Sequence, residues 1–328
     1  MIASTYVDDV ILVGRTEQCQ ALAKLARQRF NLRVTDLCVY LNVNVIRRGG
    51  KVMLTQQRYV EFIIVEAGLS EANSAVTPAV TKRVTVGEMD DAAVSVSEYR
   101  TLVGRLLWVA LGTRPDIAYA VHQLTRHYAA PTVTHMRAAK RVVRYLIGTK
   151  TLGIDVSGGG PLVAFVDADW AGDEDHRRSV SGFVIGHLRS DQSLSPVGWR
   201  VMLQTAVATS SCFAEYTACH DVCREVFALR QVYAEAGWPL GGATSVFCDN
   251  KAAVAIGESA SGTIRTKGSR YVDIRYHYAR WCSGAGHVSF RWVKGSDNPA
   301  DLFTKPLGVE VFQRHRSRMM VDVGTLDV

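Results

Sequence analysis

The segment Phe165–Asp173 constrains the fold of this chain most, because it reads as a buried apolar strand that ends by presenting carboxylates. Three further acids stand in similar settings, namely Glu215 in Ala-Glu-Tyr, Asp249 after Val-Phe-Cys, and Asp301 in Asn-Pro-Ala-Asp. Carboxylates that lie close together repel each other, so a fold that gathers four of them needs cations to hold them. Phosphodiester chemistry with two metal ions about 3.5–4 Å apart has this requirement.

The predicted elements bring these acids together. Asp167 ends one apolar strand and Asp249 ends another, so both emerge at the same edge if the two strands are neighbours in one sheet. Glu215 lies in the first turns of a predicted long helix, and Asp301 starts the predicted last helix. Taken singly, Asp167 and Asp249 each read somewhat better as a turn or cap residue. Their joint order favours a site.

Five short motifs follow one another along the second half of the chain: Asp167–Asp173, Arg177–Gly182, Ala214–Tyr216, Cys248–Ala253 and Ala300–Leu307. Together they resemble the ribonuclease H domain at the end of copia-type retrotransposon polyproteins. The similarity extends upstream over nearly the whole chain, to a reverse transcriptase palm and a helical thumb region. We therefore expect the chain to start in the middle of a reverse transcriptase.

The resemblance implies a mixed α/β (α+β) fold, with a ribonuclease H-like mixed five-stranded sheet and helices after a truncated palm fragment and a helical region. It divides the chain into four parts. These are a palm fragment with connector (1–95), a helical thumb-like region (96–156), a ribonuclease H-like domain (161–310) and a C-terminal tail (311–328). The run Ser-Gly-Gly-Gly-Pro at 157–161 is the clearest linker. After it, apolar patterns predict three strands, a helix, a strand, two helices, a strand and a final helix.

The resemblance also implies the chemistry. Asp167, Glu215, Asp249 and Asp301 are expected to be the catalytic residues and to hold two Mg²⁺ ions, with Mn²⁺ as a substitute. The expected reaction is endonucleolytic cleavage of the RNA strand of an RNA–DNA hybrid. A set of oxygen ligands without histidine or cysteine nearby in sequence suits magnesium.

A second pair of acids stands near the start. Asp8 and Asp9 lie between two apolar runs, which predicts a β-hairpin with the acids at its tip. They resemble the paired aspartates of a reverse transcriptase metal site. A polymerase needs a further aspartate from an earlier strand and the fingers that hold a nucleotide, and so little sequence precedes Tyr6 that we expect a vestigial site without polymerase activity.

Basic residues suggest a nucleic-acid partner. The net charge of +7 favours a polyanion, although a merely basic protein explains that value as well. A predicted helix at 134–148, with Thr134 as N-cap, carries a basic stripe that reads equally as a solvated face. The expected nucleic-acid-binding residues are those of the stripe and a second basic group: Arg137, Lys140, Arg141, Arg144, Arg265, Lys267, Arg270 and Arg275.

Other features set the cellular context. No apolar run reaches the length of a membrane span, so we expect an intracellular, cytoplasmic protein without membrane contact. Association with a virus-like particle or the nucleus is left open. The seven cysteines form no zinc pattern and are expected to be reduced. The expected partners are the hybrid, and the missing N-terminal polyprotein part or another reverse transcriptase chain.

One rival interpretation stays open. A truncated transposon copy could have lost catalysis and at most bind nucleic acid. The presence of all four carboxylates favours the enzyme. The truncated start favours the inactive copy, as does Tyr271, which stands where the family usually has histidine.

Overall fold

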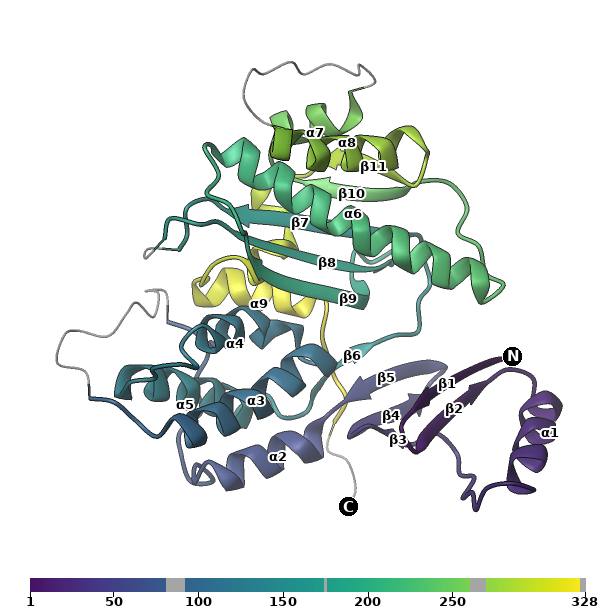
Figure 1. Cartoon of the computed structure of the whole chain (residues 1–328). Helices are drawn as coiled ribbons and strands as arrows, with labels where there is room; N and C mark the ends of the chain where they lie inside the picture. The colour runs from purple at the N-terminus through teal and green to yellow at the C-terminus, as the bar shows by residue number, and fades with distance from the viewer. Residues whose placement is uncertain (81–91, 174–175, 260–269, 325–328) are drawn as a thin grey trace.

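The described part of the chain folds into two five-stranded sheets with helices packed on them, and a separate two-stranded hairpin at the N-terminus (Figure 1). The computed structural model describes residues 1–80, 92–173, 176–259 and 270–324, with the backbone alone for 270–276. None of the helices in these described parts combines the length and the hydropathy that a membrane crossing requires.

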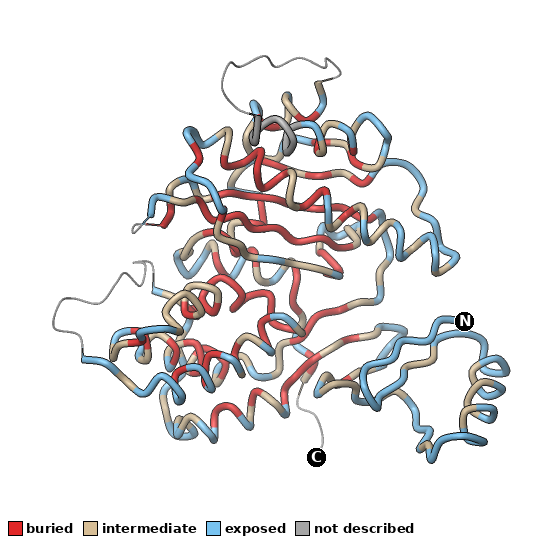
Figure 2. The backbone as a smooth tube through the Cα atoms, in the orientation of Figure 1, coloured by how far each residue is buried: buried red, intermediate tan, exposed pale blue. Residues whose placement is uncertain are grey.

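The N-terminal hairpin is exposed. Strands β1 (Ile2–Tyr6) and β2 (Asp9–Val13) pair antiparallel, and helix α1 (Thr16–Arg27) follows them. The predicted hairpin with Asp8 at its tip is confirmed. Helix α1 buries no residue, and the whole hairpin is largely exposed in Figure 2. This part of the chain therefore adds little to the hydrophobic core.

One five-stranded sheet is antiparallel and joins three distant parts of the chain in the order β12-β6-β5-β4-β3. Its strands are β3 (Val39–Tyr40), β4 (Val43–Arg48), β5 (Lys51–Thr55), β6 (Leu152–Asp155) and β12 (Val321–Asp322). Asn42 lies in the turn before β4 with a φ of 62°. Asparagine tolerates this left-handed conformation better than most residues, so it can stand where a glycine is usual.

A group of helices lies between strands β5 and β6 along the chain. These helices are α2 (Gln57–Glu66), α3 (Val96–Gly112), η1 (Pro115–Ile117), α4 (Ala118–Thr125) and α5 (Val133–Ile147). The predicted helix at 134–148 is thus present as α5, but Thr134 is not its N-cap. Thr132 is the N-cap, because its side chain and the ring of His135 form a reciprocal capping box.

The other five-stranded sheet has the order β11-β10-β7-β8-β9. Its strands are β7 (Leu162–Asp169), β8 (Val180–Leu188), β9 (Leu194–Leu203), β10 (Thr244–Cys248) and β11 (Val288–Trp292). Strands β7, β8 and β9 form an antiparallel meander, whereas β10 pairs parallel with both β7 and β11. This order and these directions confirm the predicted ribonuclease H-like fold.

Both faces of this sheet are covered. One face packs against α6 (Ser211–Glu235), α7 (Lys251–Glu258) and α8 (Arg270–Gly284). The opposite face shares a single hydrophobic core with α2, α3, α4 and α5, and the buried residues in Figure 2 run continuously between them. The indole of Trp199 in β9 also donates to the carbonyl of Ala110 in α3 at 2.8 Å. The core therefore crosses the predicted boundary at 157–161, and the domain limits stay a prediction.

The end of the chain differs from the predicted helix and tail. After η2 (Gly295–Asp297), Asp301 lies in the short 3-10 helix η3 (Pro299–Phe303), and the last helix, α9, runs only from Val309 to Ser317. Pro306 explains the break, because a proline disfavours helix at the residue before it and removes a donor. The segment expected as a tail packs into the core with Phe312 and ends as strand β12.

Candidate active site

The two central parallel strands place Asp167 and Asp249 at the same edge of the sheet. Val166 of β7 lies opposite Cys248 of β10, so the next residue on each strand is one of the two acids. Asp167 is 2% exposed, whereas Asp249 is partly exposed. The edge where parallel strands end is the usual position for ligands in open α/β sheets.

Helix α6 brings Glu215 to this edge. Its N-terminus is capped by Ser210, whose side chain accepts from the backbone N–H of Phe213 at 3.2 Å. The helix then packs its apolar face on β7 and β8. Glu215 is 6% exposed, and its Oε2 lies 3.7 Å from the Sγ of Cys248, which donates to it. Glu215 is thereby held beside Asp249.

The short helix η3 carries Asp301 to the same place. Asn298 anchors its start, since Nδ2 donates to the carbonyl of Val166 at 2.9 Å and Oδ1 accepts a backbone N–H of η3 at 3.1 Å. Gly182 of β8 lets η3 approach closely, because a Cβ there would lie 2.5 Å from the Cβ of Phe303. A larger residue at position 182 would push η3 and its carboxylate off the sheet.

Two residues that follow η3 contact these acids. The ammonium of Lys305 lies 2.9 Å from Oδ1 of Asp301 and 3.4 Å from Oδ2 of Asp167. The hydroxyl of Thr304 donates a short hydrogen bond to the same Oδ2. Thr304 and Lys305, which follow Asp301 in sequence, therefore link it to Asp167.

The closeness of the carboxylates changes their pKa values. Burial and the charge of Asp167 raise the pKa of Glu215 to about 11 and that of Asp301 to about 7. The same two causes raise the pKa of Asp249. At neutral pH the Glu215 carboxyl therefore keeps its proton unless a cation joins the site.

The donor set fits a hard divalent cation. Oxygens of Glu215 and Asp249 and the Sγ of Cys248 all lie within 4.8 Å of one another. A hydrogen bond with Cys219, together with burial, raises the pKa of Cys248 well above its usual value, so its thiol stays protonated. The thiolate, not the thiol, is the metal ligand. Carboxylate oxygens are therefore the atoms here that could hold a cation, and such sets suit Mg²⁺ or Mn²⁺.

The other predicted acids lie elsewhere. Asp8 lies in the turn of the β1–β2 hairpin and Asp9 begins β2, and both are exposed. Figure 1 places this hairpin apart from the sheet that carries the four acids. The structure therefore does not bring the two groups of acids together.

The basic stripe on α5 divides into two halves. Arg137 and Lys140 are exposed, as a surface for phosphates requires. Arg141 instead donates to Oγ1 of Thr77 at 3.1 Å, and the Nε of Arg144 donates to a backbone carbonyl at 2.7 Å. The first pair is thus more available to a ligand than the second.

The second basic group cannot be placed in the same way. Arg265 and Lys267 lie outside the described residues. Arg270 and Arg275 belong to helix α8, of which only the backbone is described there. Their expected contact with nucleic acid stays a prediction.

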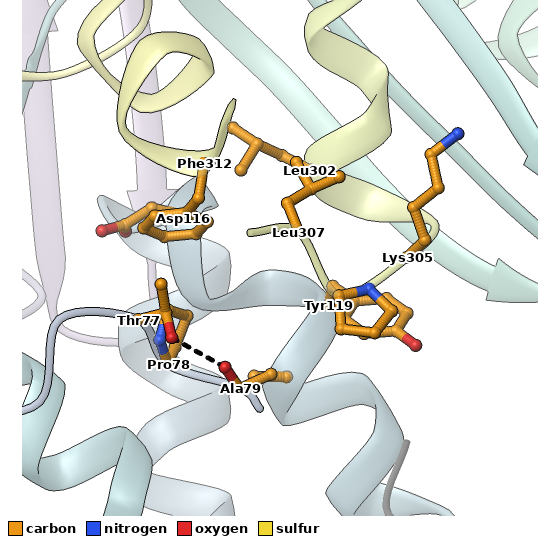
Figure 3. A pocket seen from close by; sticks show the side chains of 11 residues that line it. Thr77, Pro78, Ala79, Asp116, Tyr119, Leu302, Lys305, Leu307 and Phe312 are labelled. Atoms are coloured by element: carbon orange, nitrogen blue, oxygen red, sulfur yellow. Dashed lines mark hydrogen bonds between the residues drawn. The ribbon is translucent and has the colours of Figure 1, made fainter. Parts of the chain in front are cut away.

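A small pocket lies between the helical group and the segment that runs from η3 to α9 (Figure 3). Thr77, Asp116 and Tyr119 line it from one side, and Leu302, Leu307 and Phe312 from the other. In Figure 3 the side chain of Lys305 extends away from the pocket. Its apolar stem is thus packed at the pocket wall while its ammonium reaches the acids.

Sequence analysis missed Lys305 and Asn298 as parts of the site. Asn298 stands three residues before Asp301, and Lys305 stands four residues after it. These positions relative to the acid were the sequence signal. An i,i+4 spacing puts a lysine on the same side as the acid in helical backbone. Asn298 could have been read as a cap before the first turn.

The chain is similar to retrovirus-related Pol polyproteins from transposons. It is 30% identical over 322 residues to that of transposon RE2 and 31% identical over 323 residues to that of transposon RE1, both from Arabidopsis thaliana. It is 28% identical over 318 residues to that of transposon TNT 1-94 from Nicotiana tabacum. The matches cover 96%, 96% and 93% of this chain but 21%, 21% and 23% of those polyproteins.

Solved structures with a similar fold include two ribonucleases H. The N-terminal ribonuclease H domain of a Mycobacterium tuberculosis protein is 15% identical with a TM-score of 0.31, and the match covers 48% of this chain and 98% of that one. LC11-RNase H1, solved in complex with an RNA/DNA hybrid, is 12% identical with a TM-score of 0.33, covering 44% and 93%.

No family model matches the chain. The fold assignment rests on the strand order and directions of the chain's own sheet. Over almost its whole length the chain is similar to retrovirus-related transposon Pol polyproteins, of which it spans about a fifth.

Proposed function

We propose that this chain is a metal-dependent ribonuclease H that cleaves the RNA strand of RNA–DNA hybrids at internal phosphodiester bonds. The observation that carries the proposal is the convergence of Asp167, Glu215, Asp249 and Asp301 at one edge of a ribonuclease H-like sheet. Four different elements supply these side chains. The repulsion between these carboxylates destabilises the folded chain when no cation is bound. This argues for a cation-binding site rather than a structural cluster.

These four carboxylates are the residues that would hold Mg²⁺. When bound, two such ions activate the attacking water and stabilise the 3′ leaving oxygen of the RNA strand. The protein's own contribution is to hold the ligands. Thr304 orients Asp167 through its hydroxyl, and Asn298 fixes the turn that carries Asp301. Glu215 and Asp301 must lose the protons that their raised pKa values retain.

The surroundings of the site suit a nucleic-acid backbone. The ammonium of Lys251 lies 4.8 Å from the centre of the half-exposed Trp292 ring, whose Nε1 donates to the carbonyl of Asp249 at 3.0 Å. This pair places a cation and an aromatic surface beside one of the acids. A hybrid would be recognised there by its shape, its phosphates and its 2′-hydroxyls rather than by its sequence.

The proposed protein partner is the rest of such a polyprotein or another reverse transcriptase chain. The proposal is motivated by the similarity of this chain to 21% of the RE1 and RE2 polyproteins. We assign no polymerase activity to Asp8 and Asp9, which lie in an exposed hairpin apart from the four acids.

The proposal is tested by substrate and metal dependence. Labelled RNA is offered to the protein as a hybrid with DNA, as a single strand and as an RNA duplex, each with Mg²⁺, Mn²⁺ or a chelator. We expect cleavage of the hybrid alone, with either metal and not with the chelator. Equal cleavage of single-stranded RNA would contradict the proposal. No cleavage under any condition would favour an inactive copy that at most binds nucleic acid.

A further inference from the structure

Lys305 provides a cation from within the chain at the position where two of the acids meet. Its Nζ is 2.9 Å from Asp301 and 3.4 Å from Asp167, and the Asp167 side chain is 2% exposed. Thr304 donates to the same oxygen of Asp167 that Lys305 contacts. That oxygen therefore already has two partners before any metal arrives.

The local backbone fixes this position. Lys305 follows Asp301 by four residues through the short helix η3, and Thr304 is completely buried between them. The stem of Lys305 lies at the wall of the pocket shown in Figure 3, while the tip reaches the acids. Yet the side chain is 37% exposed, so the ammonium can leave for solvent without breaking the core.

We infer that Lys305 is a tethered counter-ion that holds Asp167 and Asp301 together when no metal is bound, and that a divalent ion must displace its ammonium group to use these oxygens. The inference rests on the proposed function, since it takes the four acids as metal ligands. Lys305 is thus a positioning residue: it keeps the ligands assembled and weakens metal binding by competition. A small dication and an ammonium group that share one carboxylate oxygen repel each other, which is why they exclude each other.

The test is calcium binding, which needs no cleavage. Calorimetry would compare the wild type with Lys305→Met, which keeps the length of the side chain and removes its charge. Lys150→Met is the matched control, because it removes the same charge from a lysine that lies 3.7 Å from Glu61 in the helical group. Lys305→Arg keeps the charge.

We expect Lys305→Met to bind Ca²⁺ on the order of ten-fold more tightly than the wild type, a difference of about 1.4 kcal/mol. The same variant should unfold at a lower temperature without metal and regain the difference in Ca²⁺. Lys150→Met and Lys305→Arg should bind Ca²⁺ like the wild type. Unchanged or weaker Ca²⁺ binding by Lys305→Met would overturn the inference, whatever its melting temperature, because a purely structural ion pair predicts no gain.

A measurement on the wild-type protein covers the case in which the variant does not fold. Acetylation of lysine amines, followed by mass spectrometry, reports how accessible each ammonium group is. Ca²⁺ should increase the labelling of Lys305 relative to Lys150, because the displaced amine becomes free. Labelling of Lys305 that stays constant or decreases in Ca²⁺ would overturn displacement. Neither readout uses hybrid cleavage, so a failure of the proposed nuclease activity would be seen separately.

Discussion

Asp167 and Asp249 leave the sheet side by side, because Val166 and Cys248, the residues before them, are paired in register on parallel strands. A one-residue slip between β7 and β10 would separate the two carboxylates by one pleat and turn one of them to the other face. The register is set by packing, since Val166 and Cys248 both belong to the core under α6. The geometry of the site thus follows from the burial of its neighbours.

The raised pKa of Glu215, about 11, predicts a stability that depends on pH. An acid whose pKa is higher in the folded than in the unfolded protein binds more protons when folded, so stability falls as pH rises above its unfolded pKa. We expect the protein in a chelator to lose stability steadily from pH 5 to pH 9, and Glu215→Gln to lose less. Urea unfolding at several pH values measures this.

A magnesium titration is the control for that series. Bound Mg²⁺ favours the charged form of Glu215, so the wild type should regain stability at pH 8 as the ion is added. Glu215→Gln should regain less. A free energy of unfolding of the wild type that changes neither with pH nor with Mg²⁺ would contradict the description of this site.

A buried ion pair predicts a large loss of stability in the helical group. Arg114 is completely buried and binds Asp116 with two hydrogen bonds, of 2.9 and 2.7 Å, and Tyr145 donates to the same carboxylate at 2.5 Å. Arg114→Met leaves the Asp116 charge buried without its partner, which should cost about 3–5 kcal/mol. Denaturant unfolding measures it. The double variant Arg114→Met with Asp116→Leu should be less destabilised than the single one; an equal or greater loss would show that the pair itself is not the cause.

The hairpin acids are expected to be irrelevant to hybrid cleavage. Asp8→Asn with Asp9→Asn changes an exposed turn apart from the four site acids, so the rate should match the wild type. A cleavage time course at saturating Mg²⁺ decides this. A loss of about ten-fold or more, with an unchanged melting temperature, would mean that the hairpin takes part, since that factor corresponds to about 1.4 kcal/mol.

The exposed half of the basic stripe should contribute to hybrid affinity. Arg137→Gln with Lys140→Gln removes two exposed charges, and the slope of log affinity against log salt should decrease by about 1–2 if both contact phosphates. Fluorescence anisotropy in Ca²⁺ at several salt concentrations measures that slope. Arg144→Gln is the comparison, because its Nε is held by the carbonyl of Asn73, and it should lower stability more than affinity. Identical slopes for wild type and double variant would mean that the stripe is only a solvated face.

Much of the fold was predictable because its signals are local. The apolar run before Asp167 is strand β7, the predicted long helix that carries Glu215 is α6, and the hairpin around Asp8 is present. Each of these elements has a hydrophobic period or a turn signal within its own residues. The convergence of the acids followed from the resemblance and from the rule that parallel strands end at one edge.

The rest depended on contacts between distant residues. No local sequence pattern predicts that residues 311–323 return to pair with β6. No such pattern predicts that one core joins Phe312 to the sheet and the helical group. The predicted last helix ends early, because Pro306 disfavours helix at the residue before it. The contact of Lys305 with Asp167 joins positions far apart in the sequence, so only the folded chain reveals it.

The central claim is that the four carboxylates catalyse hybrid cleavage, and Asp249→Asn tests it most directly. Asparagine keeps the shape of this partly exposed side chain and removes the charge that holds a cation. The measurement is paired: the rate of RNA cleavage in a labelled hybrid with Mg²⁺, and hybrid affinity in Ca²⁺ at one salt concentration. We predict that the wild type cleaves, and that Asp249→Asn loses almost all cleavage while binding at least as tightly, because affinity comes mainly from basic contacts with phosphate. Cleavage by Asp249→Asn at the wild-type rate would contradict the assignment of the site.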